Sequence, residues 1–213
     1  LQAFMPKPGR WMEQFKQFLA FPMFASALWL SWVLVIQSGP SGLLLLGIGL
    51  LALSLAIWAR KQSSLAWTVI AVLALLTGLA STLAIARLPA ATNAPNLSGT
   101  EEAWWRERVA ELRSLGQPIF VDVTAAWCVT CQVNKLGVLS DQAVVDAFQR
   151  YGVVEMRADW TNRNDEIAAL IAAHGQAGVP LYLVYPADGG PARVLPTVLT
   201  RDLVIEALAE AAG

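Results

Sequence analysis

The sequence predicts membrane-spanning helices followed by an α/β domain with a central mixed sheet and flanking helices. The chain is 56% hydrophobic and only 15% charged, with a mean hydropathy of +0.50, which is too apolar for a soluble domain of 213 residues. The charge is also segregated, because residues 1–88 contain seven charged side chains with a net charge of +5, whereas the remainder carries −6. We therefore expect a membrane region over 1–88, a linker over 89–98 and a folded domain over 99–213.

Three apolar stretches of the membrane region are each close to the ~20 residues that a helix needs to cross ~30 Å of hydrocarbon. They run over about 18–36, 42–59 and 65–86. Basic residues lie almost entirely on one side of this arrangement, at Lys7, Arg10, Lys16, Arg60 and Lys61. Because basic loops resist translocation, the segment after residue 88 is expected to face outward. The first residue is Leu, and we expect the chain to be a fragment of a longer protein.

The domain is expected to alternate short strands with helices. Ser98 and Glu101 have capping-box spacing, which predicts a helix over about 99–115 that Gly116 ends. The strands are expected over 119–124, 153–158, 181–185 and 193–195. Further helices are expected at the segment AAWCVTC, over 164–174, and from about residues 141 and 200. This order favours a small sheet with both parallel and antiparallel pairs.

Cys128 and Cys131 are the only cysteines, and they form a CxxC motif between a strand and a helix. A thiol at a helix N-terminus is favoured as thiolate by the unpaired amides and the helix dipole, so Cys128 is expected to be the nucleophile. Cys131, one turn further on, is expected to attack a mixed disulfide formed on Cys128.

A CxxC motif is also a common zinc half-site, but a structural zinc ion usually takes four ligands. No further cysteine is present, and His174, the single histidine, is expected to be a solvated residue at a helix end. We therefore expect no metal, and no cofactor other than the redox-active cysteine pair.

The segment VDVTAAWCVTC at 121–131, followed by GVP at 178–180 before a strand, resembles the thioredoxin superfamily. The resemblance implies that Pro180 is cis, packs against the disulfide and lies beside the substrate backbone, although a turn proline is the alternative from the residues alone. It implies that Trp127 shields the thiol and contacts the substrate.

Asp122 lies six residues before Cys128, where the resemblance implies a buried acid that assists proton transfer to and from Cys131. Burial in an apolar strand would raise the pKa of this carboxyl toward neutrality, which suits general acid–base work. A partly exposed position at the strand end is the alternative.

The apolar spans, the linker, the WCVTC motif and VLPTVLT at 194–200 together resemble the C-terminal part of the DsbD family of thiol:disulfide interchange proteins. The resemblance implies a thioredoxin-like domain on the periplasmic side of a bacterial inner membrane. There it would receive electrons from cytoplasmic thioredoxin through a membrane cysteine pair. It would pass them to periplasmic partner proteins, as in cytochrome c biogenesis or disulfide-isomerase reduction.

Two features depart from that family. Ala126 stands where many members carry an acidic residue, and residues 1–88 contain no cysteine. This chain therefore cannot carry electrons across a bilayer by itself. The donor is expected to be either a membrane cysteine pair upstream of Leu1 or a separate membrane protein.

Two other functions remain open from the sequence. The same fold and cysteines would serve an oxidant or isomerase, and Val129 and Thr130 between the cysteines do not decide the direction. A function of a different class is a tethered module that binds a client protein or a metal without redox turnover. Nucleic acid is not an expected partner, because the domain has no basic surface.

Overall fold

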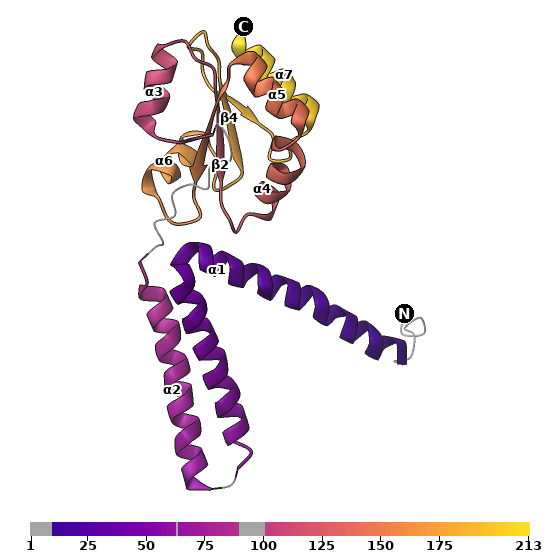
Figure 1. Cartoon of the computed structure of the whole chain (residues 1–213), viewed down its shortest axis with the longest axis vertical. Coiled ribbons are helices and arrows are strands. Elements are labelled where there is room, and N and C mark those ends of the chain that lie inside the picture. Colours follow the sequence, from indigo (N-terminus) through magenta and orange to yellow (C-terminus); the bar gives the residue numbers. More distant parts are fainter. Residues whose placement is uncertain (1–9, 63, 90–100) are drawn as a thin grey trace. The chain divides into compact units, whose positions relative to one another are not determined.

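The computed structural model describes residues 10–62, 64–89 and 101–213, in two compact units, Leu1–Ala91 and Thr92–Gly213 (Figure 1). Of the expected linker over 89–98, only Pro89 belongs to the described residues, and the expected cap Ser98 lies outside them.

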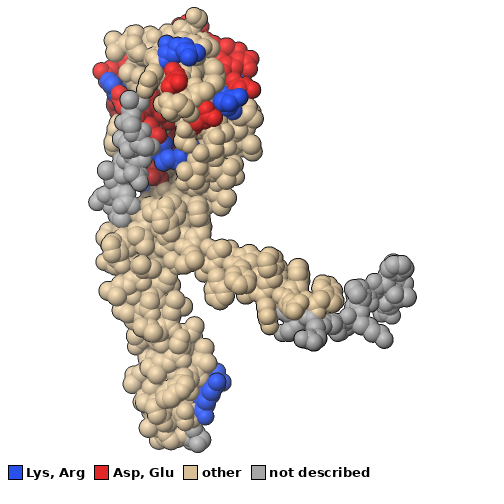
Figure 2. Space-filling view, turned by 45° about the vertical axis from the view of Figure 1, so that its right-hand side comes forward, with Lys and Arg blue, Asp and Glu red and all other residues tan. Residues whose placement is uncertain are grey.

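The first unit consists of helices α1 (Arg10–Ala59) and α2 (Leu65–Arg87). By length and composition, two segments qualify as membrane spans, Gln14–Ala59 and Leu65–Arg87. The turn between the helices carries Arg60 and Lys61, and Figure 2 shows basic side chains at one end of the helix pair. Large apolar side chains are exposed along both helices. Such a surface suits a hydrocarbon environment.

Helix α1 takes in the first two predicted spans, over 18–36 and 42–59, with a kink between them. The backbone leaves helical geometry at Gly39, with φ 69° and ψ −172°, directly before Pro40. Proline disfavours helical geometry in the residue before it and removes a hydrogen-bond donor, and glycine accepts the positive φ that results. The two arms of α1 therefore point in different directions (Figure 1). Helix α2 packs on the second arm, where the rings of Trp58 and Trp67 meet edge to face at 4.8 Å.

The second unit has a five-stranded mixed sheet in the order β1-β3-β2-β4-β5. Strand β3 pairs in parallel with β1 and β2, and β4 pairs antiparallel with β2 and β5. The strands are β1 (Glu102–Ala103), β2 (Ile119–Thr124), β3 (Val154–Asp159), β4 (Leu181–Tyr185) and β5 (Arg193–Leu195). The predicted fold class, apolar helices followed by an α/β domain with a mixed sheet, is confirmed.

Helices cover both faces of this sheet (Figure 1). One face carries α3 (Arg106–Ser114) and α6 (Asp165–Ala173). The other carries α4 (Val129–Asn134), the π-helical turn η2 (Lys135–Leu139), α5 (Gln142–Tyr151) and α7 (Arg201–Ala212).

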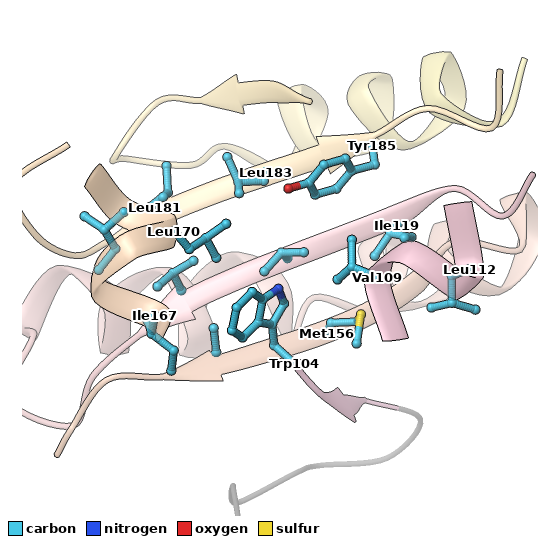
Figure 3. Packing of buried hydrophobic residues seen from close by; sticks show 14 residues of the cluster. Trp104, Val109, Leu112, Ile119, Met156, Ile167, Leu170, Leu181, Leu183 and Tyr185 are labelled. Atoms are coloured by element: carbon cyan, nitrogen blue, oxygen red, sulfur yellow. The ribbon is translucent and has the colours of Figure 1, made fainter. Parts of the chain in front are cut away.

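Alternate residues of β2 serve the two faces, because successive side chains of a strand point in opposite directions. Ile119, Val121 and Val123 join the apolar cluster beneath α3 and α6, part of which is shown in Figure 3. Phe120 joins the cluster beneath α5 and α7. By the same alternation, Asp122 lies on the face of the sheet that Phe120 occupies.

The prediction of a helix over about 99–115 was wrong for residues 101–105, and residues 99–100 lie outside the described residues. Residues 102–103 form β1 along the edge of β3, and the helix α3 begins only at Arg106. The N–H of Trp104 continues the pairing by donating to the carbonyl of Arg157 at 2.9 Å, and its indole is buried in the cluster of Figure 3. Pairing with an open strand edge and burial of the indole therefore outweigh the local helix signal.

Candidate active site

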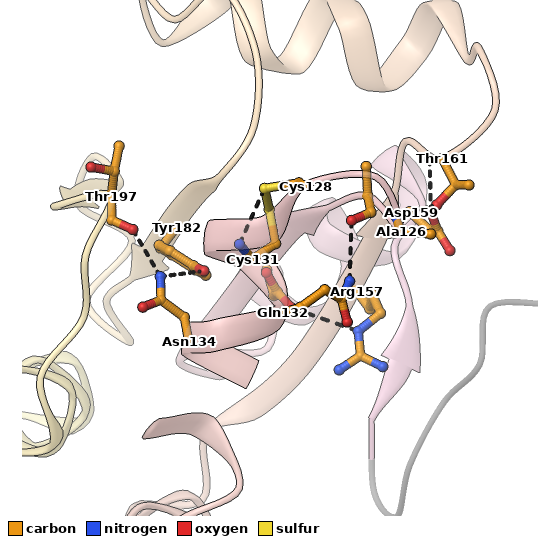
Figure 4. Close-up of a disulfide and its surroundings, with 12 residues drawn as sticks. Ala126, Cys128, Cys131, Gln132, Asn134, Arg157, Asp159, Thr161, Tyr182 and Thr197 are labelled. Carbon is orange, nitrogen blue, oxygen red and sulfur yellow. Dashed lines mark hydrogen bonds and ion pairs between the residues drawn. A yellow bond between two sulfur atoms is a disulfide. The ribbon is translucent and has the colours of Figure 1, made fainter. Parts of the chain in front are cut away.

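Cys128 and Cys131 lie at the end of the loop from β2 and the start of α4, and a disulfide joins them (Figure 4). Cys128 is the N-cap residue of α4, and its Sγ accepts the N–H of Cys131 at 3.1 Å. Cys128 is 7% exposed and Cys131 2%. Both pack with Ala125 and Val179. Cys128, at the helix start, is thus the more exposed residue of the two, and its role as the attacking thiol remains a prediction.

Pro180 follows this cluster directly, and the Val179–Pro180 peptide bond is cis. Strand β4 begins at the next residue, Leu181. The cis bond inferred for Pro180 and its position ahead of a strand are therefore observed. Its packing against the disulfide and its contact with a substrate remain predictions.

Trp127 is 40% exposed and immediately precedes Cys128. Its indole Nε1 donates to the carbonyl oxygen of Thr161 at 3.3 Å, and its ring centroid lies 6.1 Å from that of Trp160. The hydroxyl of Thr161 accepts the N–H of Ala126 at 2.8 Å, which ties the same loop to the end of β3. A cavity of about 350 Å³ adjoins the indole, lined by Trp127, Trp160, Thr161, Arg163, Asp165 and Ala168.

Asp122 is 2% exposed, so it is a buried carboxyl and not a partly exposed residue at the strand end. The strand register places it between Arg157 on β3 and Tyr182 on β4. Its Oδ2 lies 3.6 Å from Nε of Arg157, and its Oδ1 accepts no hydrogen bond from the described residues. Burial raises the pKa of Asp122 to about 6, and the charge of Arg157 acts in the opposite direction.

Asn134, which the sequence did not single out, anchors the inner end of α4 (Figure 4). It is 2% exposed, and its amide nitrogen donates to Tyr182 Oη at 2.9 Å and to the Thr197 carbonyl at 2.8 Å. Its Oδ1 accepts the N–H of Leu199 at 3.3 Å. The sequence spacing could have indicated this residue, because Asn134 lies three residues after Cys131 and so shares its helix face. The hydrogen bonds also give the segment at 197–199 a structural role.

Arg157 and Glu101 are two further buried charges that sequence reasoning missed. Nη2 of Arg157 lies 2.5 Å from Oε1 of Glu101, and the two side chains are 4% and 7% exposed. Together with Asp122 they place three buried ionisable groups on the face of the sheet that carries α4.

His174 caps the C-terminus of α6, where its Nδ1 lies 2.9 Å from the carbonyl oxygen of Leu170. Within 10–62, 64–89 and 101–213, no group of three or more His, Cys, Asp or Glu side chains is arranged to hold a metal ion.

Comparison with known proteins places residues 100–187 in the thioredoxin-like family. DsbD 1 of Pseudomonas aeruginosa is 28% identical over 211 residues, covering 88% of this chain and 35% of the relative. DsbD of Campylobacter jejuni strain RM1221 is 23% identical over 181 residues, covering 77% and 31%. The oxidised C-terminal domain of Neisseria meningitidis DsbD aligns with 52% of this chain and 98% of its own, at 22% identity and a TM-score of 0.42.

The fold and the family match define a thioredoxin-like protein whose cysteine pair occupies the start of α4. The curated relatives support its identification as the C-terminal part of a protein similar to DsbD, a thiol:disulfide interchange protein. It spans about a third of the length of the curated relatives that it matches. These relatives and the cysteine pair support a thiol–disulfide oxidoreductase.

Proposed function

We propose that the chain is a membrane-anchored protein-disulfide reductase that passes electrons from Cys128 and Cys131 to periplasmic partner proteins. The observation that carries the proposal is the geometry of this pair. Cys128 caps α4 as the more exposed sulfur, whereas Cys131 is buried behind it on the same helical turn. A nucleophile that a partner can reach and a resolving thiol that it cannot are the two groups that disulfide exchange needs.

The reaction takes place in two displacements. In the reduced chain the Cys128 thiolate attacks a disulfide of the partner, forming a mixed disulfide and expelling one partner thiolate, which takes up a proton. Cys131 then gives its proton to the Asp122 carboxylate, and its thiolate attacks Sγ of Cys128. The second partner thiolate leaves as the Cys128–Cys131 disulfide forms. Two electrons have then moved to the partner.

Exposed apolar side chains that neighbour the cysteines in the sequence support docking of a protein partner. Trp127, Val129, Val133 and Leu136 are 40%, 62%, 62% and 76% exposed, and they all lie between residues 127 and 136. Exposed apolar groups that cluster in this way mark interaction surfaces. The partner's backbone would lie beside Pro180, which follows Val179 of the cysteine cluster.

The electrons that restore the dithiol come from outside this chain, since its sequence has two cysteines in total. We propose either a membrane cysteine pair in an upstream part of the protein or a separate membrane donor. Components of cytochrome c biogenesis or an oxidised disulfide isomerase are the proposed acceptors.

Replacing Cys131 with alanine is expected to trap the partner on Cys128 as a stable mixed disulfide, because no second thiol remains to release it. The full chain carrying Cys131→Ala should produce a larger species on a non-reducing gel of membrane extracts, and dithiothreitol should remove it. The double variant that also lacks Cys128 is the matched control and should form none. An absence of adducts, together with tight metal binding by the reduced chain and no exchange, would indicate a binding module instead.

The direction of electron transfer can be tested by measuring the reduction potential of the Cys128–Cys131 pair. A reduction potential near that of thioredoxin, about −270 mV, is expected for a reductase, whereas a value near −120 mV would make the domain an oxidant.

The domain is proposed to face the periplasm of a bacterial inner membrane, on the basis of the lysine and arginine distribution in residues 1–88. Alkaline phosphatase, which matures only outside the cytoplasm, is expected to be active when fused after Gly213 and inactive when fused after Lys61. Green fluorescent protein at the same two sites should give the reverse pattern. Equal phosphatase activity at both sites would contradict this topology.

A further inference from the structure

Three buried ionisable side chains from separate parts of the domain meet beside the cysteine helix. Arg157 of β3 lies between Asp122 of β2 and Glu101, which precedes β1. Their side chains are 4%, 3% and 7% exposed. Charges withdrawn from water in this way need partners, because removing an unpaired ion from water is strongly unfavourable.

The backbone holds Arg157 in this position from both sides. On one side the β2–β3 register sets it opposite Asp122, and on the other β1 sets it opposite Ala103. The N–H of Trp104 donates to the Arg157 carbonyl oxygen at 2.9 Å. The segment that carries Glu101 is therefore fixed to the strand that carries Arg157.

The two carboxylates share one guanidinium unequally. Arg157 Nη2 lies 2.5 Å from Glu101 Oε1, whereas Nε lies 3.6 Å from Asp122 Oδ2. Asp122 therefore has the weaker contact with the cation, and its Oδ1 accepts no hydrogen bond from the described residues. Charge-assisted contacts weaken with distance, so Arg157 interacts more strongly with Glu101 than with Asp122. The stabilisation of the Asp122 carboxylate by the guanidinium is correspondingly smaller.

Other groups face Asp122 from the remaining elements around it. Lys135 of η2 favours its ionised form, and Tyr182 stands opposite it on β4. Glu155 is two residues from Arg157 on β3 and points to the same face, and burial raises its pKa to about 7. Helix α4 contributes no charged side chain to this face but contributes Cys131.

We propose that Arg157 is a positioning residue that holds Asp122 ionised for proton transfer from Cys131, and that Glu101 limits this effect by competing for the guanidinium. The inference rests on the proposed function, because it takes Asp122 as the proton acceptor of the resolving step. It adds that a residue of the segment before β1 sets the pH range in which Cys131 is activated. Arg157 touches neither sulfur and acts only through Asp122.

The resolving step can be observed with an aromatic disulfide, 5,5′-dithiobis(2-nitrobenzoate), as the probe. The reduced full chain in detergent releases one thionitrobenzoate when Cys128 attacks and a second when Cys131 resolves the adduct. The first release reports whether Cys128 is intact in each variant. The pH dependence of the second release is expected to have an acid limb at the pKa of Asp122, below which the rate falls.

Variants at the two partners of Asp122 are expected to move this limb in opposite directions. Arg157→Met removes the cation and should move the limb to higher pH by about one unit or more. Glu101→Gln removes the competing charge and should move it to lower pH, and Arg157→Lys should keep it near its original position. Arg201→Met, the same change at an exposed arginine of α7, is the matched control and should leave the limb in place. A loss of structural integrity would not produce shifts of opposite sign.

Asp122→Asn separates the role of Asp122 as proton acceptor from the role of Arg157 as its positioning residue. It should abolish the limb, and adding Arg157→Met to it should cause no further shift, because both act through one carboxyl. If Asp122→Asn keeps the limb, the proton role in the proposed function fails. If it loses the limb but neither Arg157→Met nor Glu101→Gln shifts it in the parent chain, the role of Arg157 is overturned while that of Asp122 stands. Should Arg157→Met fail to fold, the downward shift in Glu101→Gln decides the question.

Discussion

Replacing Cys128 with alanine is expected to abolish disulfide exchange, lowering the rate at which the reduced full chain reduces a disulfide substrate by about 10³-fold or more. Without this thiol no mixed disulfide can form at the start of α4. Cys131 cannot substitute for it, because it is 2% exposed and lies behind the N-cap position. The rate is measured by the release of thionitrobenzoate or by the precipitation of reduced insulin.

The comparison with two other variants makes this expectation specific. Cys131→Ala should retain the first attack and lose the release of the second thiolate. Leu115→Ala, at a 66% exposed position that ends α3, should behave as the parent chain does. A Cys128→Ala chain that reduced substrate at the parent rate would show that the cysteine pair is not the redox centre.

The parts of the site that the sequence predicted are those with local signals. The CxxC spacing and the acid six residues before it can be recognised within one short segment. The proline can be recognised because it directly precedes a strand. Strand β2 has the predicted bounds because its run of apolar and β-branched residues follows Pro118 and gives way at Ala125 to the segment that leads into the CxxC motif. The helix starts near residues 141, 164 and 200 were predictable because Asp, Asn and Thr side chains there accept backbone N–H groups.

The parts that were missed depend on contacts between residues far apart in the sequence. Glu101 and Arg157 are separated by 56 positions, and Asn134 reaches residues 48 to 65 positions away. Arginine is usually an exposed residue, and Arg157 is buried because the fold brings the carboxylates of Glu101 and Asp122 beside it. Strand β1 itself has two residues, too few for any alternation to be visible.

Phe120 belongs to the apolar cluster beneath α5 and α7, on the face of the sheet that also carries α4. It has no exposed surface, and its ring lies 5.4 Å from that of Phe148 and 6.1 Å from that of Tyr182. Tyr182 in turn accepts the hydrogen bond from Asn134 that anchors α4. Packing around this phenylalanine therefore supports both the sheet and the position of the cysteine helix.

Phe120→Ala is expected to lower the free energy of unfolding of the domain by about 3–5 kcal/mol, because it removes a buried ring and leaves a cavity that rigid strands cannot close. This is a large part of the ~5–15 kcal/mol that stabilises a typical domain. Urea unfolding of the full chain, followed by near-ultraviolet circular dichroism, measures the change. Phe120→Leu should lower the free energy of unfolding by less than about half of that amount. Leu115→Ala, at an exposed position, should lower it by about 0.5 kcal/mol or less. If Phe120→Ala and Leu115→Ala unfold at the same urea concentration, the apolar cluster beneath α5 and α7 does not limit the stability of the domain. In that case the three hydrogen bonds of Asn134 alone would have to anchor α4.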